Sequence, residues 1–236
     1  MNKPLCIIAF NLLGVTLIVS DYLTGREGFW SKVDTAVFYF FNNLLVKGSV
    51  FVDVVAYTNL RIFDVVTFLV MALLYTHCYL KKEDKASRRK MLCIGVVMLL
   101  TAIFIKQCGR FLPVSHPSPS IFFENVNRLI HLTNLPTKDA SSNSFPGDHG
   151  MMLMIFAAFM ARYHGLKAFL VAAFITMVFS MPRIASGAHW FSDIYAGSLS
   201  IVCIGLSWLL LTPASDVLAA FVGRLIPDRA FSALRL

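Results

Sequence analysis

Residues 62–112 read IFDVVTFLVMALLYTHCYL, KKEDKASRRK and MLCIGVVMLLTAIFIKQCGRFL in succession. The two apolar runs are each about 20 residues long, enough to cross the hydrocarbon core of a bilayer as helices. The segment between them carries six lysines and arginines in ten residues. Such an excess of positive charge marks a loop on the cytoplasmic side of a membrane. The stretch therefore predicts a transmembrane helical hairpin with a cytoplasmic turn.

The composition of the whole chain agrees with a membrane protein. Of its 236 residues, 57% are hydrophobic and 14% are charged, whereas soluble domains have about 25% charged residues. The net charge of +8 does not indicate nucleic-acid binding, because the basic residues fall mostly between apolar runs and form no stripe interleaved with aromatics. The length suits one compact bundle, so we expect a single domain over residues 1–236.

Four further apolar runs complete the predicted fold, which is an all-α integral membrane bundle of six helices with loops on the outer side. These runs are Pro4–Ser20, His149–Ala161, Ala168–Pro182 and Ile194–Leu211. The second and third of them are short, which favours polar helix ends buried in the bundle or local thinning of the bilayer.

Between the first two helices, residues 29–47 show an apolar stripe near helical spacing. Lys32, Asp34, Asn42 and Asn43 lie off this stripe. The pattern is typical of an amphipathic helix lying in the membrane interface. The stripe consists of Trp30, Val33, Val37, Phe41, Leu44 and Leu45.

Alternation from the basic segment fixes the expected orientation of the bundle. It places the N-terminus, the link 162–167 and the C-terminal tail on the cytoplasmic side, and that link and tail also carry basic residues. Residues 21–61, 113–148 and 183–193 are then expected outside. The unusual polar residues of the chain fall in or beside these outer segments.

The first polar group is Ser144-Phe145-Pro146-Gly147-Asp148-His149-Gly150, at the predicted start of the fourth helix. Backbone N–H groups at a helix start are free, and the helix dipole favours negative charge there. We therefore expect an anion site around Gly147, with His149 at its mouth. Asp148 is either part of that site or a helix-start residue stabilised by the dipole.

The second polar group is Arg183-Ile184-Ala185-Ser186-Gly187-Ala188-His189-Trp190-Phe191-Ser192-Asp193. His189 and Asp193 are four residues apart and would share one face of a helix. A carboxylate bonded to one imidazole nitrogen raises the basicity of the other, as a nucleophilic histidine requires. The planar guanidinium of Arg183 suits phosphate oxygens.

Lys106 and Arg110 form a third group, at the outer end of the third helix. Charges there can bind a ligand or merely reach the interface. Taken singly, His149 could be a helix-cap residue, and the His189–Asp193 pair a structural hydrogen bond. Their coincidence on one side of one bundle favours a functional site. The other histidines are interpreted as loop or interface residues: His77, His116, His131 and His164.

The spacing Arg183-x5-His189-x3-Asp193 resembles the third signature of the type 2 phosphatidic acid phosphatase superfamily. That family's pattern is Lys-x6-Arg-Pro, Pro-Ser-Gly-His and Ser-Arg-x5-His-x3-Asp. The second motif here has Gly147 in place of serine and Asp148 in place of glycine, and the third begins with proline. No Arg-Pro pair follows Lys106, and Arg110 could replace the missing arginine.

Within that superfamily, the stretches around residues 137–152 and 187–191 are similar to the lipid A phosphotransferases of Gram-negative bacteria. The resemblance implies transfer of phosphate from undecaprenyl diphosphate to the 1-phosphate of Kdo2-lipid A, at the periplasmic face of the inner membrane. It implies neither a cofactor nor a metal, since cationic side chains neutralise the phosphate. Membrane lipids are expected as surroundings and nucleic acid is not expected as a partner.

The resemblance also implies a role for each site residue. His189 is the nucleophile, Asp193 orients it, and His149 is the acid and base. The phosphate-binding residues are Arg183, Lys106, Arg110, Gly147 and Asp148. Apart from the resemblance, Arg128 and Lys138 of the long outer loop are candidates for binding the acceptor head group. Two alternatives stay open: a hydrolase of the same fold acting on undecaprenyl diphosphate or lipid A 1-phosphate, and a non-enzymatic lipid-binding or transport protein.

Overall fold

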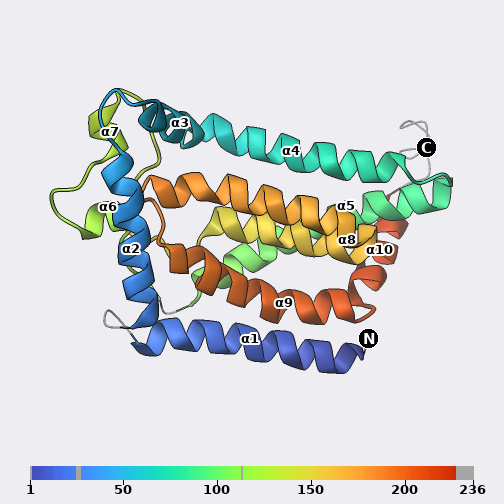
Figure 1. Cartoon of the computed structure of the whole chain (residues 1–236). Coiled ribbons are helices and arrows are strands. Elements are labelled where there is room, and N and C mark those ends of the chain that lie inside the picture. Colours follow the sequence, from blue (N-terminus) through green and yellow to red (C-terminus); the bar gives the residue numbers. More distant parts are fainter. Residues whose placement is uncertain (1, 25–27, 113, 227–236) are drawn as a thin grey trace.

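The described chain consists of helices and the loops that join them. The computed structural model describes residues 2–24, 28–112 and 114–226, without the side chains of Thr24 and Arg110. Figure 1 shows the long helices side by side, with α2, α6 and α7 at one end of them. The expected all-α membrane fold is confirmed. The elements are α1 (Lys3–Thr24), α2 (Phe29–Leu44), α3 (Val50–Thr58), α4 (Arg61–Leu80), α5 (Lys85–Arg110), α6 (Pro119–Phe122), α7 (Leu129–Leu132), α8 (Asp148–Ala185), η2 (Asp193–Ser198), α9 (Leu199–Leu211) and α10 (Ala214–Leu225).

Helix α8 folds back on itself at Gly165, where φ is +84°. Glycine adopts a positive φ readily, whereas a residue with a Cβ does not. A straight helix of 38 residues would hold its ends about 57 Å apart. Instead Asp64 lies 3.8 Å from His149 Nδ1 at one end and 2.5 Å from Arg183 Nη2 at the other. Figure 1 shows the two arms, yellow and orange, side by side.

The hairpin in α8 explains how a single long helix accounts for two of the membrane crossings predicted from the sequence. In the described part of the chain, five helices are long and apolar enough to cross a membrane. The fourth of them is α8, whose two arms provide the fourth and fifth predicted crossings. Both arms extend beyond the short apolar runs because their polar outer ends are held inside the protein. The five helices span Lys3–Leu23, Arg61–Leu80, Lys85–Gly109, Asp148–Ala185 and Asp193–Leu211.

The outside of the bundle is apolar and the inside is close-packed. Leu73, Phe104 and Phe174 are each at least 60% exposed on α4, α5 and α8. Soluble proteins rarely expose apolar surface on this scale, so lipid must cover it. The main core lies between α5, α8, α9 and α10, around fully buried residues such as Ile94 and Met151.

The basic segment and the motif-bearing loops lie at opposite ends of the bundle. Lys90 pairs with Asp216 at 2.8 Å, and Arg89 donates to the Gly223 carbonyl at 3.0 Å, so α10 packs beside the start of α5. Figure 1 places α10, the start of α1 and the α4–α5 connection together, away from α2, α6 and α7. This separation agrees with the charge distribution of the sequence.

Helix α2 crosses the loop end of the bundle, as Figure 1 shows. Its buried residues are Asp34, Phe38 and Asn42, and both polar ones belong to the residues that lie off the apolar stripe. They are buried because they bind the backbone of the loops. Asp34 accepts hydrogen bonds from the Ser192 amide and hydroxyl at 2.8 and 2.6 Å. Burial raises the pKa of Asp34 to about 6, although these bonds oppose the shift.

Candidate active site

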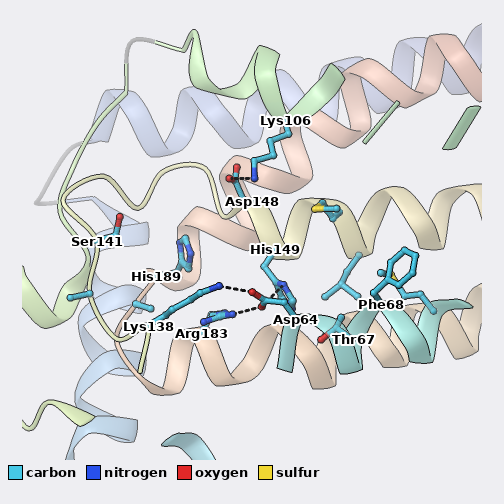
Figure 2. A pocket seen from close by; sticks show the side chains of 15 residues that line it. Asp64, Thr67, Phe68, Lys106, Lys138, Ser141, Asp148, His149, Arg183 and His189 are labelled. Atoms are coloured by element: carbon cyan, nitrogen blue, oxygen red, sulfur yellow. Dashed lines mark hydrogen bonds and ion pairs between the residues drawn. The ribbon is translucent and has the colours of Figure 1, made fainter. Parts of the chain in front are cut away.

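A cavity of about 450 Å³ brings the sequence motifs together at the loop end of the bundle. Its walls come from α4, the outer end of α5, the loop before α8 and both outer ends of α8. Figure 2 shows the charged side chains and both histidines around this space. Three cations line it, Lys106, Lys138 and Arg183, with the two carboxylates Asp64 and Asp148. The excess of positive charge suits an anionic ligand.

His189 is oriented by a backbone carbonyl as well as by a carboxylate. Its Nδ1 lies 2.8 Å from the Ser144 carbonyl oxygen and 3.4 Å from Asp193 Oδ2. Because a carbonyl oxygen can only accept, the hydrogen of neutral His189 sits on Nδ1 and Nε2 keeps its lone pair. The ring lines the cavity. A nucleophilic nitrogen is therefore available in the cavity wall.

His189 and Asp193 were expected to meet on one face of a helix, but the structure brings them together differently. His189 lies in the bend that precedes the helical residues starting at Phe191. The two residues therefore meet across a turn rather than on one helix face. Asp193 begins the π-helical segment η2, and segments of this kind are frequent at functional sites.

Asp193 is fully buried and joins the two main motifs. Its Oδ2 accepts the Trp190 amide at 2.9 Å. Its backbone carbonyl accepts the Gly147 amide at 3.1 Å and the Ser198 hydroxyl at 2.9 Å. The loop that carries His149 is thereby fixed against the turn that carries His189.

Arg183 is held by an asparagine that does not appear in the expected site. Nη1 of Arg183 donates to Asn59 Oδ1 at 3.2 Å. Asn59 is itself fully buried, and its amide donates to the Val55 and Pro182 carbonyls at 2.8 and 2.9 Å. Arg183 is only 5% exposed. Such a buried and anchored guanidinium is preorganised for a phosphate.

Asp64 is the main site residue that the sequence reasoning missed. Its carboxylate accepts hydrogen bonds from Lys138 Nζ and Arg183 Nη2, both at 2.5 Å, and faces His149 Nδ1 at 3.8 Å. Figure 2 shows it between these groups. An ionisable residue inside an apolar run is by default a candidate for function in a membrane protein. The run that begins at Ile62 carries that signal.

Lys106 and Asp148 form an ion pair of 3.0 Å across the cavity wall. Asp148 thus binds a cation of the site, which places the odd residue of the second motif beside the first motif. Arg110 was expected to accompany Lys106. Its side chain lies outside the described residues, so its role stays a prediction.

Gly147 is a packing residue rather than a donor to the cavity. Its amide is taken by the Asp193 carbonyl, which corrects the expectation that this N–H binds phosphate. A Cβ at position 147 would lie 2.8 Å from Ile194 Cγ1. This close approach explains why glycine stands where the related motif has serine.

Two further expectations about the loop residues change. His116 was interpreted as an isolated loop residue, but its Nε2 lies 3.5 Å from Asp193 Oδ1. Arg128 was a candidate for an acceptor head group, but it faces Asp139 at 3.6 Å and does not line the cavity. Lys138, its companion in that expectation, does line it.

Metal-binding clusters were searched for throughout the described ranges. Among residues 2–24, 28–112 and 114–226, no group of three or more His, Cys, Asp or Glu side chains is placed to hold a metal ion. The cations of the cavity wall are protein side chains: Lys106, Lys138 and Arg183.

Comparison with known proteins gives one family match and two relatives. A family model described as the PAP2 superfamily matches residues 90–217. The Escherichia coli (strain K12) protein named "Lipid A 1-diphosphate synthase" is 47% identical over 224 residues, which cover 94% of each chain. "Putative undecaprenyl-diphosphatase YbjG" of the same strain is 26% identical over 117 residues, 49% of this chain and 53% of its own. No solved structure matches significantly. The family segment includes His149, Arg183 and His189, whereas Asp64 lies outside it.

Proposed function

The chain belongs to the PAP2 superfamily, and we propose that it transfers a phosphate group between two lipids of the bacterial inner membrane. The donor is undecaprenyl diphosphate and the acceptor is the 1-phosphate of Kdo2-lipid A. The products are undecaprenyl phosphate and lipid A 1-diphosphate. Identity of 47% over 94% of both chains to a protein named for lipid A 1-diphosphate synthesis supports this assignment.

The observation that carries the proposal is the fixed tautomer of His189 in a cationic cavity. The Ser144 carbonyl keeps hydrogen on Nδ1, so Nε2 can attack phosphorus. Arg183 and Lys106 line the same cavity and neutralise the oxygens of the phosphate as charge develops on them. A transport protein needs no histidine held in one tautomer, so this geometry favours an enzyme.

In the first step Nε2 of His189 attacks the terminal phosphorus of the donor. The N–P bond forms, and the bond from that phosphorus to the bridging oxygen breaks. His149 gives its proton to the departing undecaprenyl phosphate, while Asp193 stabilises the positive charge on His189. The product of this step is a phosphohistidine.

In the second step an oxygen of the lipid A 1-phosphate attacks the phosphohistidine. The new O–P bond forms, the N–P bond breaks, and neutral His189 is regenerated, while His149 takes up the proton of the incoming acceptor phosphate and so recovers the one it gave to the leaving group. The acceptor is already an anion, so it needs cations more than it needs a base. Lys138 lies beside Ser141 on the loop wall of the cavity and is placed to bind it. The preference for phosphate over water follows from this charge.

The lipid tails leave the cavity on its apolar side. Phe68 and Met71 of α4, together with Met152 of α8, line the cavity beyond the charged groups. Phe68 is about half exposed on α4, so it connects the cavity to the outer apolar surface of the bundle. We therefore assign the space between α4 and the first arm of α8 to the prenyl chain of the donor.

The membrane orientation completes the proposal. Residues 1–236 act as one domain, the basic segment and both termini face the cytoplasm, and the cavity faces the periplasm. Single cysteines placed at Glu83 and Ser142, both exposed, in a cysteine-free protein test it. A membrane-impermeant maleimide should label position 142 and spare position 83 in intact inner-membrane spheroplasts. The reverse pattern would invert the orientation.

Purified protein with undecaprenyl diphosphate labelled in its terminal phosphate tests the function, with and without Kdo2-lipid A. Label should appear on lipid A and should require His189. A phosphatase is the second candidate, favoured by the 26% identity to a protein named as an undecaprenyl-diphosphatase. Label released only as inorganic phosphate, at the same rate with and without lipid A, would establish the phosphatase instead.

A further inference from the structure

Asp193 stands between two histidines. Its Oδ2 faces His189 Nδ1 at 3.4 Å and accepts the Trp190 amide. Its Oδ1 is buried and, within the described part of the chain, has no hydrogen-bond partner. The Nε2 atom of His116 lies 3.5 Å from that Oδ1. One carboxylate thus connects the proposed nucleophile with a histidine on the far side of the turn.

A fully buried carboxylate requires compensation on both oxygens. Asp193 has no exposed surface, and an ionised carboxyl group with an unpaired oxygen is costly in such a place. The charge of Asp193 helps His189 only while the group stays ionised and keeps its orientation. Whatever binds Oδ1 therefore affects the reactivity of His189.

His116 is itself held firmly in the position from which it faces Asp193. Its carbonyl accepts the Ser144 amide at 3.0 Å, and its Nδ1 lies 3.3 Å from Ser144 Oγ. Its ring contacts Phe145 and Trp190, with centroids 5.8 and 6.4 Å away. The Ser144 hydroxyl lies 3.3 Å from both the carbonyl oxygen and Nδ1 of His116. When it donates to Nδ1, the ring hydrogen sits on Nε2, facing Asp193.

These contacts form a closed cycle that links four residues. Ser144 offers its carbonyl to His189 and its amide to His116, and both histidines face Asp193. A change at any member is therefore transmitted to the others. The loop before α8 and the turn after α8 both contribute residues to this cycle of contacts.

We propose that His116 is a positioning residue for His189. It donates a hydrogen bond from Nε2 to Asp193 Oδ1, and so satisfies this buried oxygen and keeps the carboxylate directed at His189. The separation of 3.5 Å is long for such a bond, and hydrogen bonds of ligand-free enzymes commonly tighten when substrate binds. The inference rests on the proposed function, because it assigns a role in the same reaction.

The charged groups around His116 favour this role. His116 lines a second cavity of about 450 Å³, together with Asp21 of α1 and Asp34 of α2. The imidazole contacts Asp193 of η2, and the second cavity that it lines has two further acidic residues in its wall. Acidic surroundings favour a donor at this position. None of the residues of the first cavity lines the second, so His116 does not touch the substrate and acts on His189 through its neighbours Asp193 and Ser144.

Two variants of His116 test the proposal against a simple packing role. His116→Leu removes the donor, whereas His116→Gln keeps an N–H at a similar reach. We expect His116→Leu to lower kcat of phosphate transfer by about 10- to 100-fold, by analogy with the loss of an outer partner of a metal-bound histidine. KM for the donor should change by less than about twofold, because no contact with substrate is lost. His116→Gln should recover most of the rate.

A second readout does not depend on the lipids. Diethyl pyrocarbonate modifies unprotonated imidazole nitrogens, and peptide mass spectrometry reports the rate at His189. That rate should fall in His116→Leu, recover in His116→Gln and stay unchanged in His131→Leu, a control at an exposed histidine of α7.

The outcomes separate this inference from the proposed function. Unchanged kcat and unchanged modification of His189 in His116→Leu would overturn the role of His116, as would equal losses in the Leu and Gln variants. Absence of transfer to lipid A by the wild-type protein would overturn the proposed function. The modification rates would then still decide whether His116 acts on His189.

Discussion

Nδ1 of His189 lies closer to the carbonyl oxygen of Ser144, at 2.8 Å, than to the carboxylate of Asp193, at 3.4 Å. The tautomer of the proposed nucleophile is thus set by backbone, and the carboxylate adds charge. The sequence motif assigns two functions to Asp193, fixing the tautomer of His189 and supplying negative charge. In the structure the Ser144 carbonyl fixes the tautomer and Asp193 supplies the charge.

Replacing the nucleophile should abolish transfer. In His189→Gln the amide can still bond to the Ser144 carbonyl, so the fold is retained, but no phosphorus–nitrogen intermediate can form. We expect transfer to be slower by more than about 10⁴-fold, beyond the range of a lost acid or base alone. Acid-labile label on wild-type protein incubated with donor alone should be missing from the variant. A variant that still becomes labelled would assign the nucleophile to another residue.

Replacing Asp64 should affect binding and turnover in opposite directions. Its carboxylate holds Lys138 and Arg183 in the free protein, so it competes with phosphate for both. Asp64→Asn should lower KM for the donor several-fold and should lower kcat by about tenfold, because His149 loses the carboxylate it faces. Steady-state kinetics with varied donor measure both quantities.

The exposed Asp53 of α3 offers the matched control, and Asp53→Asn should leave both constants unchanged. A rise in KM in Asp64→Asn would mean that the carboxylate helps to bind the donor, which would refute the competition.

Restoring the serine of the related motif should harm this protein. A side chain at position 147 meets Ile194 at 2.8 Å, and overpacking of this kind typically costs about 1–3 kcal/mol. Gly147→Ser should therefore unfold at a lower temperature and transfer phosphate more slowly. Adding Ile194→Ala opens the space and should recover part of the activity. Thermal unfolding in detergent, compared among the three proteins, measures the effect; full activity of Gly147→Ser alone would contradict it.

The free energy of unfolding should depend on pH because of Asp34. Its pKa is raised from 3.8 to about 6 by burial, so the folded state binds a proton more tightly than the unfolded chain does. The free energy of unfolding therefore falls as pH rises from about 4 to about 6, by up to about 3 kcal/mol, and is flat beyond. Asp34→Asn should remove this slope. Unfolding temperatures between pH 4 and pH 8 test it, and equal slopes in the two proteins would exclude Asp34 as the cause.

Chelation should leave the activity unchanged. The cavity offers side-chain cations for the phosphate oxygens, so the reaction as proposed needs no divalent ion. Transfer assayed after dialysis against EDTA should equal transfer with added Mg²⁺. Loss of activity on dialysis, restored by one particular metal, would require a different account of how the phosphate is neutralised.

The large features of the fold could be predicted from the sequence, because apolar runs and basic loops are strong local signals. The arrangement of α2 could not be predicted from the sequence. Its buried face carries Asp34 and Asn42, and these polar side chains are buried because they bind loops. His149, Arg183, His189 and Asp193 were predictable from their spacing.

Asp64 and His116 were missed for a different physical reason. Each stands alone in the chain, and each joins the site only through tertiary contacts with residues far away in sequence. Gly147 was misassigned because its amide looks free at a helix start, whereas the Asp193 carbonyl comes close to it in the folded protein.

Because of the hairpin in α8, the geometry of the site depends on the rigidity of the bend at Gly165. His149 stands at the tip of one arm and Arg183 near the tip of the other, and the arms join at Gly165, a distance of about 25 Å along the first arm. At that leverage a rotation of about 5° at Gly165 would displace a tip by roughly 2 Å, and misplacement of about 1 Å can cost about 10²-fold in rate. The accuracy of the chemistry therefore depends on the stiffness of a bend at the opposite end of the bundle.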